Sequence, residues 1–235
     1  MADNQKWYFA YGSNMLSDVF IRRRKIQPLR SEVAVIKTHT LCFNIMGVPY
    51  TDPAMGGLRP AEEQDLPVYG VAYLLSSEDM RQMIVSEGGG IAYKTELLSA
   101  TLQSDGSEVN VNTLMGRHII PRSYERLPSG RYMSLLIRGA SEHSLPDLYQ
   151  KRLLSQQTFI PGQGCRFKVG KWLFDGFWQR VAYWIEKGVG KFKDGEGNVP
   201  PWFLLVFDFL LWTMWYYHDY AHGVIWGRGD GLNRK

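Results

Sequence analysis

The 235-residue sequence contains little cysteine, and this scarcity excludes a fold held together by disulfides. Its two cysteines, Cys42 and Cys165, are far apart and fit neither a Cys-x-x-Cys motif nor a metal-ligand spacing. We therefore expect a reducing compartment. Residues 1–6 lack the basic-then-apolar pattern of a secretory signal, so the predicted location is the cytoplasm.

The sequence also lacks a strong excess of charge, internal repeats and low-complexity tracts. The formal net charge is only +4. The one dense basic run, Arg22 to Lys25, lies where Phe20 and Ile26 would turn inward, which predicts a solvated basic face. Because nucleic-acid binding would need a broader basic surface and a readable motif, no nucleic-acid partner is predicted. With 45% hydrophobic residues, the chain can form one large or two small domains.

Strand-like patterns dominate the first half of the chain. Strands are predicted over residues 7–11, 32–43, 68–75, 94–102 and 108–115, with a hairpin turn at 104–107. A short helix is predicted over residues 77–85, capped by Ser76 or Ser77. Several strands with few intervening helices indicate an α+β fold around a curved or closed sheet.

The most informative segment is the turn at residues 9–15, Phe-Ala-Tyr-Gly-Ser-Asn-Met. It joins the first predicted strand to a segment with helical spacing from Leu16 onward, and Ser13 or Asn14 are possible caps. The start of a helix presents unpaired amide donors and a partial positive charge, which suit a carboxylate or a developing oxyanion. An ordinary corner, in which Gly12 supplies backbone freedom and a side chain merely caps, is the alternative.

A second informative segment is Ser-Glu-Gly-Gly-Gly-Ile-Ala-Tyr at residues 86–93. Its single carboxylate, Glu87, is followed by three glycines that leave room for a ligand beside it. A simple surface turn beginning at Glu87 is the alternative.

With these two motifs the sequence resembles the γ-glutamylcyclotransferase family. The hallmarks of that family are a Tyr-Gly-Ser-Asn turn near the N-terminus and a later Glu-Gly pair. The resemblance covers residues 7–115, including the strand at 67–75. Residues 128–132, 135–140 and 142–146 look like the fungal branch, whose members remove γ-glutamyl groups from glutathione conjugates during the synthesis of gliotoxin-type metabolites. The resemblance implies a small mixed β-barrel with outer helices.

The resemblance also implies a reaction and its residues. In that reaction the α-amine of a γ-glutamyl group attacks its own amide carbonyl and releases 5-oxoproline, without a metal or cofactor. Glu87 would be the catalytic acid/base. The substrate-binding residues would be Tyr11, Gly12, Ser13, Asn14 and Met15, together with Tyr93, whose spacing from the glutamate is about one residue shorter than in the family. A γ-glutamyl amidase that uses water and a non-catalytic ligand-binding protein of the same fold remain alternatives.

The character of the sequence changes after about residue 145, where helical and aromatic patterns take over. A wide apolar helix face is predicted from Leu173, Phe174, Phe177, Trp178, Val181, Trp184 and Ile185. A glycine-rich loop at 188–198 leads to a second apolar segment at 202–217, which contains Asp208 and is shorter than the ~20 residues that cross a bilayer. We expect a γ-glutamylcyclotransferase-like domain over 1–165 and a helical, aromatic-rich extension over 166–235.

Three interpretations of this extension remain open. A helical pair packed on the core is favoured, while an apolar lid over a bulky substrate and an interfacial membrane helix are alternatives. A homodimer is also left open.

Two smaller motifs near the C-terminus are predicted to have no role in binding or catalysis. His218 and His222 stand one helical turn apart, as in zinc-binding helices, but no obvious third ligand follows, so capping or core hydrogen bonding is predicted. Arg228-Gly229-Asp230 is expected to lie in a flexible tail.

Overall fold

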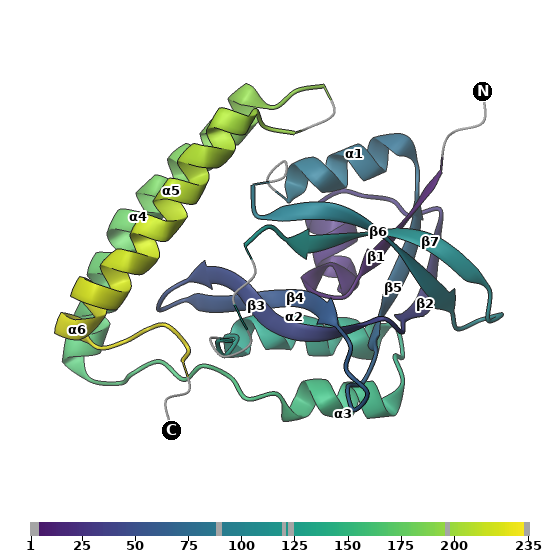
Figure 1. Cartoon of the computed structure of the whole chain (residues 1–235), viewed down its shortest axis with the longest axis horizontal. Helices are drawn as coiled ribbons and strands as arrows, with labels where there is room; N and C mark the ends of the chain where they lie inside the picture. Colours follow the sequence, from purple (N-terminus) through teal and green to yellow (C-terminus); the bar gives the residue numbers. More distant parts are fainter. Residues whose placement is uncertain (1–4, 88–90, 119–120, 122–124, 196–197, 233–235) are drawn as a thin grey trace.

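The computed structural model describes residues 5–87, 91–118, 121, 125–195 and 198–232. Its centre is a closed barrel with the strand order β1-β5-β2-β6-β7 (Figure 1). These strands are β1 (Lys6–Ala10), β2 (Arg30–Ile36), β5 (Val68–Leu75), β6 (Tyr93–Leu102) and β7 (Glu108–Gly116). β1 runs parallel to β7 and the other neighbouring pairs are antiparallel, so the barrel is mixed. The predicted α+β fold around a closed sheet is confirmed.

One predicted strand is two strands in the structure. The sequence pattern predicts a continuous strand over residues 32–43, but the chain turns at 37–38 and β3 (His39–Val48) leaves the barrel. β3 pairs with β4 (Asp52–Pro60) in a separate two-stranded sheet. β4 was not predicted, because Pro53, Pro60 and the Gly56-Gly57 pair are residues that strands usually avoid.

The segment after β1 also differs from its prediction. Instead of an α-helix, the chain forms a short 3₁₀ turn, η1 (Ser13–Met15), and a π-helix, η2 (Asp18–Arg23). Neither element has a side-chain cap. Phe20 is nevertheless fully buried, as predicted, and stacks on Tyr73 with ring centroids 4.3 Å apart. Burial of this ring against the barrel holds η2 in place without regular α-helical geometry.

Three helices lie against the barrel and its neighbouring sheet: α1 (Ser77–Ser86), α2 (Gly130–Glu142) and α3 (Asp147–Ser155). α1 begins as predicted, since the Ser76 side chain accepts a hydrogen bond from the Asp79 amide. α2 passes close to η1 at Gly139, where a β-carbon would stand 2.8 Å from the Met15 β-carbon. The glycine therefore allows α2 to pack directly behind the turn at residues 12–15.

The last quarter of the chain forms a helical arm, made of α4 (Cys165–Phe192), α5 (Pro201–Tyr217), the π-helix η4 (His218–His222) and α6 (Gly223–Trp226). Figure 1 shows α4 and α5 side by side along one edge of the molecule. α4 continues through Gly188, so the predicted glycine-rich loop starts several residues later than expected. Gly188 serves packing and does not end the helix, because a β-carbon there would lie 2.5 Å from the Phe203 ring.

Residues 227–232 return from the arm and are firmly bonded. The Tyr50 amide donates to the Gly229 carbonyl at 2.7 Å, and the Leu127 amide donates to the Gly231 carbonyl at 2.8 Å. Asp230 is buried. The prediction of a flexible tail around Arg228 to Asp230 was wrong, because local sequence does not reveal these distant partners.

The two histidines of the arm are buried and bonded to protein atoms. His218 Nε2 accepts from the Gly229 amide at 3.0 Å, and its Nδ1 lies 2.9 Å from Asp219 Oδ1. His222 Nε2 lies 2.8 Å from the Gly170 carbonyl. The His218 contact joins the arm to the returning chain, and the His222 contact joins η4 to α4 within the arm.

In the described part of the chain, we find no helix with the length and apolar character required to cross a membrane.

Candidate functional site

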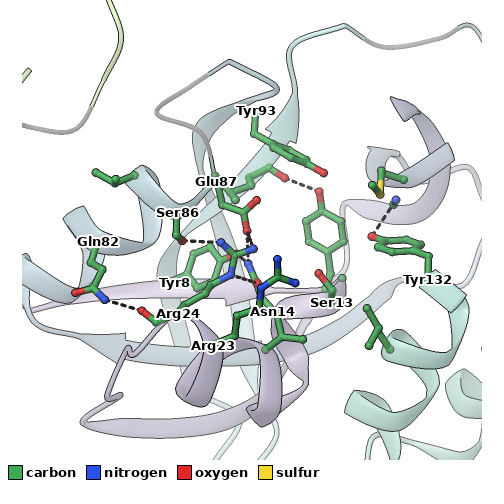
Figure 2. A pocket seen from close by; sticks show the side chains of 18 of the residues that line it. Tyr8, Ser13, Asn14, Arg23, Arg24, Gln82, Ser86, Glu87, Tyr93 and Tyr132 are labelled. Carbon is green, nitrogen blue, oxygen red and sulfur yellow. Dashed lines mark hydrogen bonds and ion pairs between the residues drawn. The ribbon is translucent and has the colours of Figure 1, made fainter. Parts of the chain in front are cut away.

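A cavity of about 620 Å³ opens where the turn at residues 12–14, the end of α1 and the start of α2 meet (Figure 2). Its described lining residues all lie between Tyr8 and Leu135, and none belongs to the helical arm. The apolar lid interpretation of the arm therefore gains no support from them. The sequence-predicted residues that line the cavity are Tyr11, Gly12, Ser13, Asn14, Glu87 and Tyr93.

Glu87 meets the N-terminal turn directly. The Asn14 side-chain amide donates to Glu87 Oε1 at 2.8 Å, and Arg24 Nη2 lies 2.5 Å from the same oxygen. The Glu87 side chain is 16% exposed. Two segments 73 residues apart thus meet beside the cavity, which is the proximity predicted from the sequence. Gly88, Gly89 and Gly90 lie outside the described residues.

Arg24 completes a closed network around this carboxylate. Its Nε donates to Asn14 Oδ1 at 2.9 Å and its Nη1 donates to Ser86 Oγ at 2.6 Å. Gln82 in turn donates to the Arg24 carbonyl at 2.5 Å. Because guanidinium is planar and donates in fixed directions, it orients the carboxylate as well as attracting it.

The inward direction of Arg24 corrects the prediction for the basic run. Arg22 is exposed as expected, with 82% of its side chain accessible, but only 15% of the Arg24 side chain is. Arg24 follows the buried Phe20 by four residues, and residues at that spacing share a helix side. This spacing was the available signal that one of the four cations would turn inward.

Four phenols surround the cavity: Tyr8, Tyr11, Tyr93 and Tyr132. Burial raises the pKa of each of them, to about 12 for Tyr132, and the nearby Glu87 charge adds to the effect at Tyr8, Tyr93 and Tyr132. At neutral pH all four therefore remain protonated. They can supply neutral hydrogen-bond donors to a ligand.

Three of these hydroxyls are already bonded to the protein. Tyr11 donates to the Leu114 carbonyl at 2.5 Å, and Tyr8 accepts from the Asn14 side chain at 2.9 Å. Tyr132 accepts from the Gly56 amide at 3.1 Å, so its proton can point elsewhere. A β-carbon at Gly12 would lie 3.1 Å from the Tyr132 hydroxyl, which places α2 directly across from the turn.

Met15 differs from its predicted place in the site. Its amide donates to the Gly12 carbonyl at 3.1 Å, and its side chain is fully buried in the core. The tight 3₁₀ geometry of η1 uses this amide internally, and so removes it from the group predicted to face a ligand. Gly12, Ser13 and Asn14 remain at the cavity wall.

The cavity wall is rich in positive charge. Arg23, Arg24, Lys25 and Arg131 contribute to it, whereas Glu87 is the acidic residue among the described lining residues. Arg131 is held by an ion pair with Asp52, which also accepts from Ser129. Such a wall favours a ligand with more than one negative group.

Sequence reasoning missed Tyr8, Arg24, Arg131 and Tyr132. Tyr8 lies in the first predicted strand, and no role in the site was predicted for it. Arg131 and Tyr132 lie in the segment 128–132 that already carried the resemblance to the fungal branch. Nothing in their local pattern indicates that α2 would bring them opposite the turn.

Comparisons with known proteins show which family the chain belongs to. The chain is 52% identical over 221 residues to a protein of Claviceps purpurea named gamma-glutamyl cyclotransferase gliK, covering 92% of this chain and 100% of that protein. It is 34% identical over 244 residues to a gamma-glutamyl cyclotransferase gliK of Aspergillus fumigatus, covering 96% and 89%. A family model described as the AclK C-terminal domain matches residues 165–225, which make up nearly all of the helical arm.

A solved structure titled gamma-glutamyl cyclotransferase shares the fold, with a TM-score of 0.57 and 19% identity over 70% of this chain and 96% of that chain. On the sequence relatives, the chain belongs to the γ-glutamyl cyclotransferase family of enzymes.

Proposed function

We propose that this protein releases 5-oxoproline from a γ-glutamyl amide in the cavity beside Glu87. The observation that carries the proposal is the contact of Glu87 with Asn14 and Arg24 at the wall of a cavity large enough for a peptide-sized ligand. The names of the two fungal relatives support the same reaction.

In this reaction the α-nitrogen of the glutamyl group bonds to its own γ-carbon and closes a five-membered ring. The bond from that carbon to the departing nitrogen then breaks. The α-nitrogen starts as an ammonium and ends as a lactam N–H, so two protons move from it to the departing nitrogen. Glu87 carries them in turn, as a base toward the first nitrogen and an acid toward the second.

The polar groups around Glu87 have distinct tasks in this proposal. Both contacts from Asn14 and Arg24 fall on Oε1, so Oε2 is the oxygen that exchanges protons with the substrate. The amides at the start of η1 hold the α-carboxylate or the oxyanion, and the Tyr132 hydroxyl donates to the same substrate. Holding the glutamyl chain in a curled form adds the rate advantage of an intramolecular reaction.

The proposed substrate is a glutathione conjugate of a secondary metabolite. Glutathione carries a second carboxylate beyond the γ-glutamyl group, and the cavity wall offers Arg23, Lys25 and Arg131 for it. The relatives named gliK support a fungal metabolite as the attached group.

Two free cysteines are consistent with the proposed cytoplasmic location, where thiols stay reduced.

We further propose that residues 1–165 form the catalytic unit and 166–235 an extension with another task. The lining residues of the cavity support this division, because they come from the first 135 residues.

A product assay tests the proposal. Purified protein is incubated with a γ-glutamyl dipeptide, glutathione and an aromatic S-conjugate of glutathione, and 5-oxoproline is measured by mass spectrometry. Glu87→Gln is expected to lower the rate by roughly 10²–10⁴-fold, because the amide cannot carry the proton. Glu78→Gln, in the helix α1 that Glu87 caps but with 69% of its side chain exposed, is the matched control and should keep the parent rate.

The product also separates the alternatives. Free glutamate in place of 5-oxoproline would mean that water attacks the carbonyl and that the protein is an amidase. Binding of these compounds without turnover would mean a non-catalytic member of the family. Full activity of folded Glu87→Gln would remove Glu87 from the reaction.

A further inference from the structure

The outer side of α5 carries a row of exposed apolar side chains. They recur every three or four residues, which places them on one side of the helix. We call them the aromatic row, which continues by one residue into η4: Trp202, Leu205, Phe209, Trp212 and Tyr216 of α5 and Tyr220 of η4. Their exposed fractions lie between 45% and 77%. Soluble surfaces rarely leave so many large rings together in water.

The row is continuous. The rings of Trp212 and Tyr216 lie 6.4 Å apart, and those of Tyr216 and Tyr220 stack at 5.7 Å. Asp208, the one acidic residue of α5, is bound by Arg117 at 2.9 Å and His118 at 2.7 Å from the barrel side. The only charged residue of α5 thus pairs with the residues that follow β7, and no residue of the aromatic row is charged.

The exposed side of α4 has a second row, called the mixed row, which contains both cations and apolar groups. The mixed row recurs at the same spacing: Arg166, Val169, Leu173, Phe177, Arg180, Trp184, Lys187 and Lys191. All eight residues are exposed, and the row contains no acidic residue.

Most residues of the two rows lie outside the interior of the arm. Two of them do join its helices: the Trp202 ring lies 5.0 Å from the Phe192 ring of α4, and Arg166 donates to the Val224 carbonyl of α6 at 3.0 Å. The arm's interior consists of other residues, including Phe174 and Trp178 from α4 and Met214 and Trp215 from α5. Near its tip, Phe203 packs on Val189. The sequence predicted one wide apolar face on α4, but the structure divides it, burying Phe174 and Trp178 and exposing Leu173, Phe177 and Trp184.

We propose that the helical arm binds the surface of an anionic phospholipid bilayer through these two rows. Tryptophan and tyrosine favour the boundary between lipid headgroups and acyl chains, because each ring combines an apolar body with a polar atom. Lysine and arginine beside them are attracted by anionic headgroups. Helices with one such side lie in the plane of the membrane interface.

A second copy of the chain fits the mixed row less well. Self-pairing of α4 would bring Arg180 and Lys187 of one copy toward the cations of the other, with no acidic residue in the row to offset them. A bilayer with anionic lipids complements both rows. Its apolar layer can take up the exposed rings, and its negative charge can attract the cations.

Vesicle flotation tests the proposal with the full-length protein. The parent is mixed with phosphatidylcholine vesicles with and without phosphatidylserine, at low and high salt. We expect flotation with the phosphatidylserine vesicles and weaker flotation at high salt, since salt screens the cations. Charge reversal in Arg180→Glu with Lys187→Glu should lower the vesicle affinity at least ~10-fold, since each basic residue near such a surface contributes several-fold. Phe209→Ser with Trp212→Ser should lower it by a similar factor, because lost ring burial weakens interfacial binding.

Matched controls use residues outside the arm. Leu97→Ser with Leu154→Ser removes two apolar side chains that are 63% and 65% exposed, and Lys37→Glu with Lys151→Glu reverses two exposed cations. Both pairs should float like the parent. Circular dichroism and thermal unfolding establish that each variant is folded.

Three results would overturn the proposal. The first is a parent protein that does not float with phosphatidylserine vesicles and shows no tryptophan quenching by brominated lipid in them. The second is equal binding by arm variants and controls. The third is a parent dimer that Phe209→Ser with Trp212→Ser dissociates, since a second copy would then cover the aromatic row.

Discussion

The barrel and the helical arm place polar and apolar side chains in opposite ways. Beside the cavity, Asn14, Arg24 and Glu87 are largely enclosed and bonded to one another. On the arm, rings such as Trp184 and Phe209 face solvent. A chain gains stability by enclosing apolar groups and solvating charged ones, so both regions depart from the simplest arrangement.

The two departures have different physical consequences. An enclosed charge must be paired, and the pairing fixes its geometry, which suits proton transfer at a defined position. An exposed ring needs no such pairing, and its apolar surface stays available to contact an apolar partner such as the interior of a bilayer. The contrast indicates that this chain holds two functional surfaces, one for a small molecule and one for a larger partner.

The largest effect is expected at the base of the arm. Phe174 is buried among Tyr50, Trp178, Tyr217 and the two arm histidines. Phe174→Ala should lower the free energy of unfolding by about 3–5 kcal/mol, because it leaves a cavity where the arm meets the turn between β3 and β4. Urea unfolding measures this change. Phe177→Ala, whose side chain is 59% exposed, should change the free energy by about 0.5 kcal/mol or less.

If the two units are as separate as proposed, folded Phe174→Ala protein should release 5-oxoproline from a γ-glutamyl dipeptide at the parent rate. A large loss of that rate in folded protein would mean that the arm supports the catalytic geometry.

The next effect concerns the orientation of Glu87. Arg24→Met removes the guanidinium that holds Glu87, Asn14 and Ser86, and kcat/KM for 5-oxoproline release should fall by about 10²-fold, as expected for a displaced reactive group. Arg24→Lys keeps the charge without the planar donor set and should be intermediate. Arg22→Met is the exposed control. Parent activity in Arg24→Met would show that Asn14 alone is enough to position the carboxylate.

Much of the barrel could be predicted because its signals are local. The strand over 68–75 matches β5 at both ends, and Ser76 caps α1 as its position suggested. Alternation and capping depend on neighbours in sequence, so they can be interpreted without the fold. β4 could not be found this way, since it forms despite its glycines and prolines only because β3 lies beside it.

The site was predictable only in part, and for a similar reason. The Tyr-Gly-Ser-Asn turn and Glu87 were found through a family resemblance that joins distant motifs. Arg24 and Tyr132 become site residues only when η2 and α2 pack against the barrel, and Met15 leaves the site because of the 3₁₀ geometry of η1. The exposed rows of the arm look like core residues until their neighbours are known.

A smaller effect is expected at alkaline pH. Burial, helped by the Glu87 charge, raises the pKa of Tyr132 from the ordinary value of 10.0 to about 12. Below pH 10 both the folded and the unfolded chain keep this proton, and the contribution to stability is complete. Between pH 10 and 12 the unfolded chain loses the proton first, so stability should fall as pH rises, by on the order of 2 kcal/mol for this residue.

Urea unfolding as a function of pH measures this decline. Tyr132→Phe removes the titrating group, so its stability should decline less steeply with pH than that of the parent, although it is less stable at neutral pH because the Gly56 amide loses its acceptor. Identical slopes for the two proteins would contradict the enclosed position of this phenol.

The smallest effect concerns α1, the helix that ends directly before Glu87. Ser76→Ala removes the acceptor of the Asp79 amide and should lower the free energy of unfolding by about 1 kcal/mol. Ser99→Ala, exposed on β6, is the control and should have little effect. Glu87 lies at the opposite end of α1 and is held there by Asn14 and Arg24, so kcat/KM for 5-oxoproline release should stay near the parent value. A loss of activity that exceeds the loss of stability would instead mean that the helix as a whole positions the carboxylate. In that case the position of Glu87 beside the cavity would depend on α1 as a whole and no longer on the side-chain network around Arg24.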